Sequence, residues 1–165
     1  MERLSVKDKL TGLYNAVYIR ERLDEEIQRA IHYQRPCSFA LLVIKHFDDY
    51  ASSHGEGAVE EALKMIADVV NGHMREFDRA ARIGRGEFVI ILPDKNKKKC
   101  IELIEKVERD VAALNLCVSP SDALTLCAGV SENPIDGVEA NTLYIKAQDR
   151  MRLAYSQGKP LEAFV

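Results

Sequence analysis

The sequence contains no tryptophan, only 7% aromatic residues and four cysteines among 165 residues. Cys37, Cys100, Cys117 and Cys127 lie far apart and form no Cys-x-x-Cys pair, which predicts reduced and mostly buried thiols instead of a disulfide framework. The histidines also lack the spacing of a zinc site, which needs about four converging ligands. We therefore expect no metal centre built on these residue types.

Long apolar runs and an excess of positive charge are absent too. No run approaches the roughly 20 apolar residues of a membrane-spanning helix, and residues 1–5 lack the apolar stretch of a signal peptide. Lys plus Arg is 23 and Asp plus Glu is 26, which gives a net charge of −3. Nucleic-acid binding depends on many cationic contacts to phosphates. The composition thus predicts a soluble, cytoplasmic globular domain with no membrane span and no nucleic-acid partner.

Hydrophobic periodicity predicts alternating helices and strands. We expect helices at 16–33, about 58–70, about 94–114 and about 140–156, and strands at 37–44, 77–83, 87–92, 123–131 and 161–165. Asn15 is the expected cap of the first helix, and the polar stretch 48–57 is expected to connect the first strand to the second helix. This order predicts one α+β domain with a β-α-β-β-α-β core, whose mostly antiparallel sheet is flanked by helices.

Three short segments carry a resemblance to a known family. Residues 8–15 read DKLTGLYN, residues 44–47 read IKHF after the first strand, and residues 82–88 read RIGRGEF. They resemble the motifs D-x-L-T-G-L-x-N, D-[ILV]-D-x-F and R-[YF]-G-G-[DE]-E-F of the GGDEF domains, the diguanylate cyclases that make cyclic di-GMP from two GTP molecules. The resemblance covers essentially the whole chain. It implies the family's nucleotidyl-cyclase-like sandwich, with the N-terminal motif and helix at 1–35 and the core at 36–165.

The resemblance fails at the positions that carry the family's chemistry. In the family, a first-strand Asp and the third hairpin residue hold two divalent metals over the GTP phosphates, because phosphoryl transfer needs hard oxygen ligands. Here Val43 and Lys45 stand at the two first-strand Asp positions, and Gly86 stands at the third hairpin position. Glu87 remains, but one carboxylate does not rebuild a two-metal site. We expect neither a metal cofactor nor cyclase activity.

The nucleotide-binding positions have changed as well. Ala51 stands at the family's guanine-contacting Asn, and Tyr155 stands at its phosphate-contacting Lys. Glu60 replaces the guanine-reading Asp and can still accept hydrogen bonds from a guanine edge. These losses make GTP binding without turnover the least favoured of the nucleotide-binding hypotheses.

Arg85 replaces the family's second hairpin Gly, between Gly84 and Gly86. The two glycines are expected to supply the positive φ of a tight hairpin. The Arg85 guanidinium either holds a phosphate in the vestigial site or pairs with Glu87, or it is an exposed turn residue. We favour the turn residue, because turns are solvated.

An Arg-x-x-Asp pattern precedes the hairpin motif by five residues. Arg75 and Asp78 match the family's inhibitory site, which binds a dimer of cyclic di-GMP. An arginine fork binds guanine O6 and N7 or a phosphate, and an aspartate accepts from the guanine ring. Lys106 stands at the family's supporting Arg, and Arg79 adds charge nearby. The other interpretation, an exposed ion pair between a helix and a strand, stays equally open.

The leading hypothesis is an inactive GGDEF-type domain that binds cyclic di-GMP through Arg75 and Asp78, assisted by Lys106 and Arg79. The alternative is a nucleotide-free interaction module. Such a module docks a protein partner or a neighbouring sensory or receiver domain, or it forms a homodimer as the active relatives do.

Overall fold

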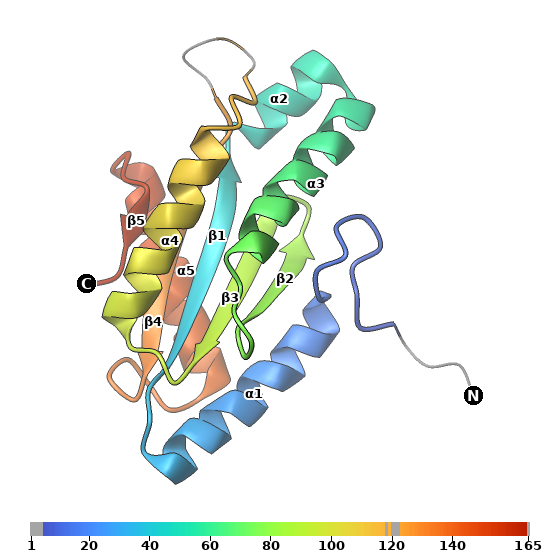
Figure 1. Ribbon diagram of the computed structural model, residues 1–165. Coiled ribbons are helices and arrows are strands. Elements are labelled where there is room, and N and C mark those ends of the chain that lie inside the picture. The colour runs from blue at the N-terminus through green and yellow to red at the C-terminus, as the bar shows by residue number, and fades with distance from the viewer. Residues whose placement is uncertain (1–4, 118, 120–122, 165) are drawn as a thin grey trace.

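The computed structural model describes residues 5–117, 119 and 123–164. Their elements follow the order α1 (Ala16–Tyr33), β1 (Cys37–Lys45), α2 (Phe47–His54), α3 (Glu56–Gly72), β2 (Arg79–Gly84), β3 (Glu87–Pro93), α4 (Lys97–Ala112), β4 (Thr125–Asn133), α5 (Ala140–Ser156) and β5 (Leu161–Glu162). The strands form one sheet in the order β2-β3-β1-β4-β5. All pairs are antiparallel except β4–β5, which is parallel. The predicted α+β sandwich is confirmed (Figure 1).

Helices cover both faces of the sheet, so the central strand β1 is buried on both sides. Ala40 and Leu42 pack into one core with α3 and α4, while Phe39 and Leu41 pack into a second core with α1 and α5. This explains why the sequence of β1 is a continuous apolar run instead of an alternating one. The strand predicted at 37–44 is confirmed.

The helix boundaries follow from local capping. The Asn15 side chain accepts a hydrogen bond from the Tyr18 N–H at 2.9 Å, and α1 ends where Gln34 adopts a left-handed φ of 53°. Asn96 caps α4 in the same way, by accepting from the Lys99 N–H at 3.0 Å. Helix α4 starts at Lys97, later than the predicted start at about residue 94. Asp94 has a left-handed φ of 61°, which is not helical, so the helix cannot begin there.

The connection expected over 48–57 is wrong, because most of it forms α2. Tyr50 and Ala51 follow Phe47 by three and four residues, so all three side chains lie on one face of a helix. They pack against the core. Tyr50 is only 8% exposed. Polar residues between these three conceal the helical pattern in the sequence.

The hairpin also differs from the prediction, since neither Gly84 nor Gly86 adopts a left-handed φ. A register shift between Arg82 and Gly84 accommodates the chain reversal instead. The Arg82 guanidinium donates to the Arg85 carbonyl at 3.1 and 3.2 Å, and the Ile44 N–H donates to the Gly86 carbonyl at 3.0 Å. These bonds fix the turn without the conformational freedom of glycine.

The cysteines are free thiols, as the sequence predicts. Cys37, Cys100 and Cys127 are buried, and burial raises the pKa of the Cys37 thiol to about 12. Within the described ranges, no helix is both long and apolar enough to cross a membrane.

Candidate functional site

The N-terminal motif is fastened along the outer edge of β2. Asp8 accepts hydrogen bonds from the Thr11 N–H and hydroxyl at 3.0 and 2.7 Å, and it pairs with Arg82 at 3.3 Å. The Tyr14 N–H donates to the Ala80 carbonyl, and the Arg82 N–H donates back to the Tyr14 carbonyl. Partial burial raises the pKa of Asp8, but the Thr11 hydrogen bonds and the Arg82 charge outweigh it and lower that pKa.

The positions that the resemblance assigns to catalysis gather where β1 ends beside the β2–β3 turn. Val43 and Glu87 are register partners, and together with Gly86 they line a pocket of about 450 Å³. Asp48 and Asp49 of α2 also line it, although the motif alignment at Phe47 excludes both from the first-strand Asp positions and the sequence does not predict their helix. The described residues hold no group of three or more His, Cys, Asp or Glu side chains placed to bind a metal ion. The donor set thus does not fit the family's two metals.

Two contacts join replaced positions around this pocket. The Lys45 ammonium lies 5.8 Å from the centre of the Tyr155 ring, so the residues at a family Asp and a family Lys face each other. The Arg85 guanidinium lies 5.3 Å from the centre of the Phe47 ring and forms an ion pair with Glu56. The considered pairing of Arg85 with Glu87 is therefore not formed, and the turn is instead linked to the start of α3.

Glu87, Ala51 and Glu60 take no part in these contacts. The Glu87 side chain lies against Gly84, where an added Cβ would be 3.0 Å from its Oε2 atom. Ala51 packs against the core, and Glu60 is an exposed residue of α3 that does not line the pocket. Val43 and Gly86, at the positions that the resemblance assigns to metal binding, therefore line one pocket, whereas Glu60, at the position assigned to guanine reading, does not.

The turn between α3 and β2 is built around Asp78. Its side chain is only 2% exposed. One carboxylate oxygen accepts from the Arg75 N–H at 2.9 Å, and the other pairs with the Lys95 ammonium at 2.6 Å. Arg75 is exposed, and across the described ranges its guanidinium has no hydrogen bond or ion pair. The Arg75–Asp78 ion pair considered from the sequence is thus replaced by a hydrogen bond to the Arg75 backbone.

Arg75, Asp78 and Arg79 line one pocket of about 300 Å³. The Arg79 guanidinium is oriented by the Glu76 and Asp78 carbonyls, at 3.1 and 3.0 Å. Lys7 and Tyr14 of the N-terminal motif line the same pocket. Sequence reasoning missed these two residues, because it interpreted that motif as a mark of the fold and no spacing links it to Arg75.

Lys106 lies outside this pocket. It is an exposed residue of α4, one helical turn before Asp110. The Asp110 carboxylate is 2.7 Å from His73 Nε2, close to where α3 ends. Lys106 therefore lies on the same face of α4 as Asp110.

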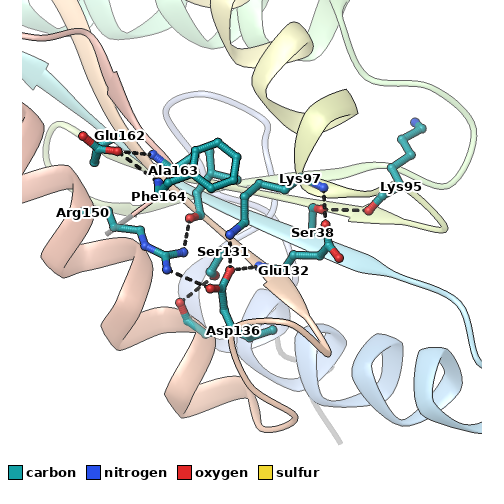
Figure 2. A network of polar contacts seen from close by, with 12 residues as sticks. Ser38, Lys95, Lys97, Ser131, Glu132, Asp136, Arg150, Glu162, Ala163 and Phe164 are labelled. Carbon is teal, nitrogen blue, oxygen red and sulfur yellow. Dashed lines mark hydrogen bonds and ion pairs between the residues drawn. The ribbon is translucent and has the colours of Figure 1, made fainter.

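A separate polar network is buried where β4 ends (Figure 2). Asp136 pairs with Lys97 and with Arg150, both at 2.8 Å, and each of the three side chains is at most 7% exposed. Arg150 also donates to the Val130 carbonyl, and the Lys97 N–H donates to Glu132. Burial raises the pKa of Asp136, but hydrogen bonds from Arg150 and Lys97 outweigh it and hold that pKa well below its usual range. These side chains are fully engaged with each other and form a structural network.

The comparison with known proteins identifies the family. The family model described as "Diguanylate cyclase, GGDEF domain" matches residues 5–160, so the chain belongs to the GGDEF family. The response regulator PleD of Caulobacter vibrioides is 28% identical over 159 residues, which cover 94% of this chain and 35% of PleD. Diguanylate cyclase DgcP of Pseudomonas aeruginosa is 29% identical over 147 residues, covering 88% of this chain and 22% of DgcP. The chain thus spans about a third or less of these relatives.

Solved structures show the same fold. The GGDEF domain of DgcB from Caulobacter crescentus, in complex with c-di-GMP, superposes with a TM-score of 0.89 at 21% identity, covering 99% of this chain and 98% of that one. Diguanylate cyclase SiaD from Pseudomonas aeruginosa, in complex with its activator SiaC, gives a TM-score of 0.86 at 27% identity. That match covers 97% of this chain and 61% of SiaD.

Proposed function

We propose that residues 1–165 form a single GGDEF-type domain that lacks cyclase activity and acts as a receptor for cyclic di-GMP. One observation carries the receptor assignment. Among the described residues, the Arg75 guanidinium has no hydrogen bond or ion pair, and Arg75 lines a pocket that Arg79 also lines, while the Asp78 carboxylate accepts from the Arg75 N–H. Relatives of the same fold include a GGDEF domain bound to c-di-GMP.

Cyclic di-GMP offers this pocket two phosphodiesters and two guanine edges. An arginine fork binds either group through two parallel hydrogen bonds, which assigns the main contact to Arg75. Asp78 has both carboxylate oxygens engaged, so its role is to position Arg75 instead of contacting guanine. Lys106 and Arg79 contribute charge, although Lys106 lacks the fork of an arginine.

The loss of cyclase activity follows from the side chains at the vestigial site. Val43 and Gly86 supply no oxygen ligand, and the Lys45 ammonium repels a divalent cation placed near it. The contact between Arg85 and Glu56 further joins the turn to α3 beside the pocket. Positioning and charge neutralisation supply nearly all of the catalysis in phosphoryl transfer, and these residues provide neither.

Calorimetric titration with cyclic di-GMP, with GTP plus magnesium in parallel, tests the proposal. We expect binding in the micromolar range or tighter for cyclic di-GMP and no heat for GTP. Arg75→Ala should abolish binding and leave the melting temperature unchanged, because the side chain is exposed and unpartnered. Arg152→Ala, an exposed arginine on α5, is the matched control and should bind like the wild type. Retained binding in Arg75→Ala refutes the site.

A second candidate is the nucleotide-free interaction module. Val17 and Tyr33 of α1 are 67% and 62% exposed, so this helix presents apolar side chains to solvent. Such residues suit a protein partner, a neighbouring sensory or receiver domain, or a second copy of the chain. Two results would favour this function over the receptor. Calorimetry would show no binding of cyclic di-GMP or GTP, and light scattering would show a dimer that Val17→Asp converts to a monomer.

A further inference from the structure

The N-terminal segment, residues 5–15, forms one wall of the Arg75 pocket. Lys7 and Tyr14 line the pocket and pair with each other through an antiparallel bridge. The Lys7 ammonium lies 3.8 Å from the centre of the Tyr14 ring. Over the part of the chain that the structure describes, this ammonium has no carboxylate partner. Lys7 thus lines the pocket together with two further cations, Arg75 and Arg79, and the Asp78 carboxylate.

The charges around the pocket favour a ligand with more than one negative charge. Lys7, Arg75 and Arg79 contribute three cations, whereas the single carboxylate, Asp78, is already neutralised by Lys95. We propose that Lys7 is a further ligand contact, which binds one phosphodiester of the cyclic dinucleotide while Arg75 binds the other end. This inference rests on the proposed receptor function and adds the N-terminal segment to its binding surface.

Tyr14 gives the same wall a second property. Its ring is stacked on Tyr18, with centroids 4.2 Å apart and planes at 19°. Because Lys7 also approaches within 3.8 Å, the two neighbours occupy opposite faces of the ring. A phosphate that attracts the Lys7 ammonium uncovers one face, on which a guanine base can stack. The backbone bonds of Tyr14 to Ala80 and Arg82 fix the main chain at this position.

Titration of Lys7→Ala with cyclic di-GMP tests this inference, with Lys9→Ala as the matched control. Lys9 is an exposed lysine of the same segment that does not line the pocket. We expect Lys7→Ala to weaken binding about tenfold, as loss of a charged hydrogen bond does, and Lys9→Ala to bind like the wild type. Lys7→Arg should restore most of the affinity. Both alanine variants should keep the wild-type melting temperature.

Hydrogen–deuterium exchange supplies a second readout. Ligand should slow exchange of the backbone amides of residues 5–15 in the wild type but not in Lys7→Ala. If Lys7→Ala binds as tightly as Lys9→Ala while Arg75→Ala does not bind, the role of Lys7 is refuted and the receptor function stands. If the wild type binds no cyclic di-GMP, the receptor function fails and the role of Lys7 fails with it.

Discussion

The charged residues at the two ends of the sheet are paired in opposite ways. Where β1 ends, Arg85 and its partner Glu56 are 49% and 72% exposed. At the other end, where β1 begins and β4 ends, Asp136 holds both Lys97 and Arg150 in the interior. The first end therefore consists of separate contacts in solvent, and the second is one connected network.

This difference explains which end can change without loss of the fold. An exposed ion pair contributes little to stability, whereas removing one partner of a buried pair leaves an uncompensated charge. Substitutions at the exposed end are thus expected to cost little stability. The Arg75 pocket depends on the buried end instead, because Lys95 pairs with Asp78 and its carbonyl accepts from Ser38 of β1.

The largest effect should come from Asp136→Ala. This change leaves Lys97 and Arg150 buried without their shared carboxylate, and we expect it to lower the free energy of unfolding by about 3–5 kcal/mol. Urea denaturation measures the change. Glu56→Ala, which removes the acidic partner at the exposed end, should cost less than about 1 kcal/mol. Equal losses in the two variants would erase the distinction between the ends.

Acid should weaken the buried end selectively. The pKa of Asp136 is lower in the folded protein than its ordinary value of 3.8, so its contribution to stability is complete above the unfolded-state pKa. That contribution is lost as the pH falls below about 4 toward the folded-state pKa. Urea denaturation between pH 7 and pH 3 should show a steeper loss in the wild type than in Asp136→Asn, which has no carboxylate to titrate. Parallel profiles would contradict this role.

Asp78→Ala should have an intermediate effect, because Asp78 is buried but has only one cationic partner. The variant loses the ion pair with Lys95, and we expect the free energy of unfolding to fall by about 1–3 kcal/mol. Cyclic di-GMP binding should weaken as well, since the Arg75 backbone loses its anchor. Lys95→Met separates the two effects, because it removes the ion pair but keeps the carboxylate that accepts from the Arg75 N–H. Full affinity in Asp78→Ala would contradict the positioning role.

The sequence predicts the fold better than it predicts the sites. Apolar periodicity and caps such as Asn15 are local, and they place most helices and strands correctly. Helix α2 escapes this reasoning because only Phe47, Tyr50 and Ala51 mark its buried face. The state of Asp78 is also hidden from the sequence, since its partner Lys95 comes from beyond the next hairpin. Long-range pairing of this kind, like the place of Lys7, depends on the complete fold.

The smallest effect is expected where the turn meets α3, and a double-mutant cycle can measure it. Arg85→Ala and Glu56→Ala remove the two sides of one solvated ion pair, so their coupling free energy should stay below about 1 kcal/mol and shrink further in salt. Arg85 also contacts Phe47, which Arg85→Ala removes and Glu56→Ala preserves. The cycle therefore separates the ring contact from the charge pair. A coupling free energy above about 2 kcal/mol would contradict the view that the exposed end contributes little to stability. It would mean that the Arg85–Glu56 ion pair holds the β2–β3 turn against α3.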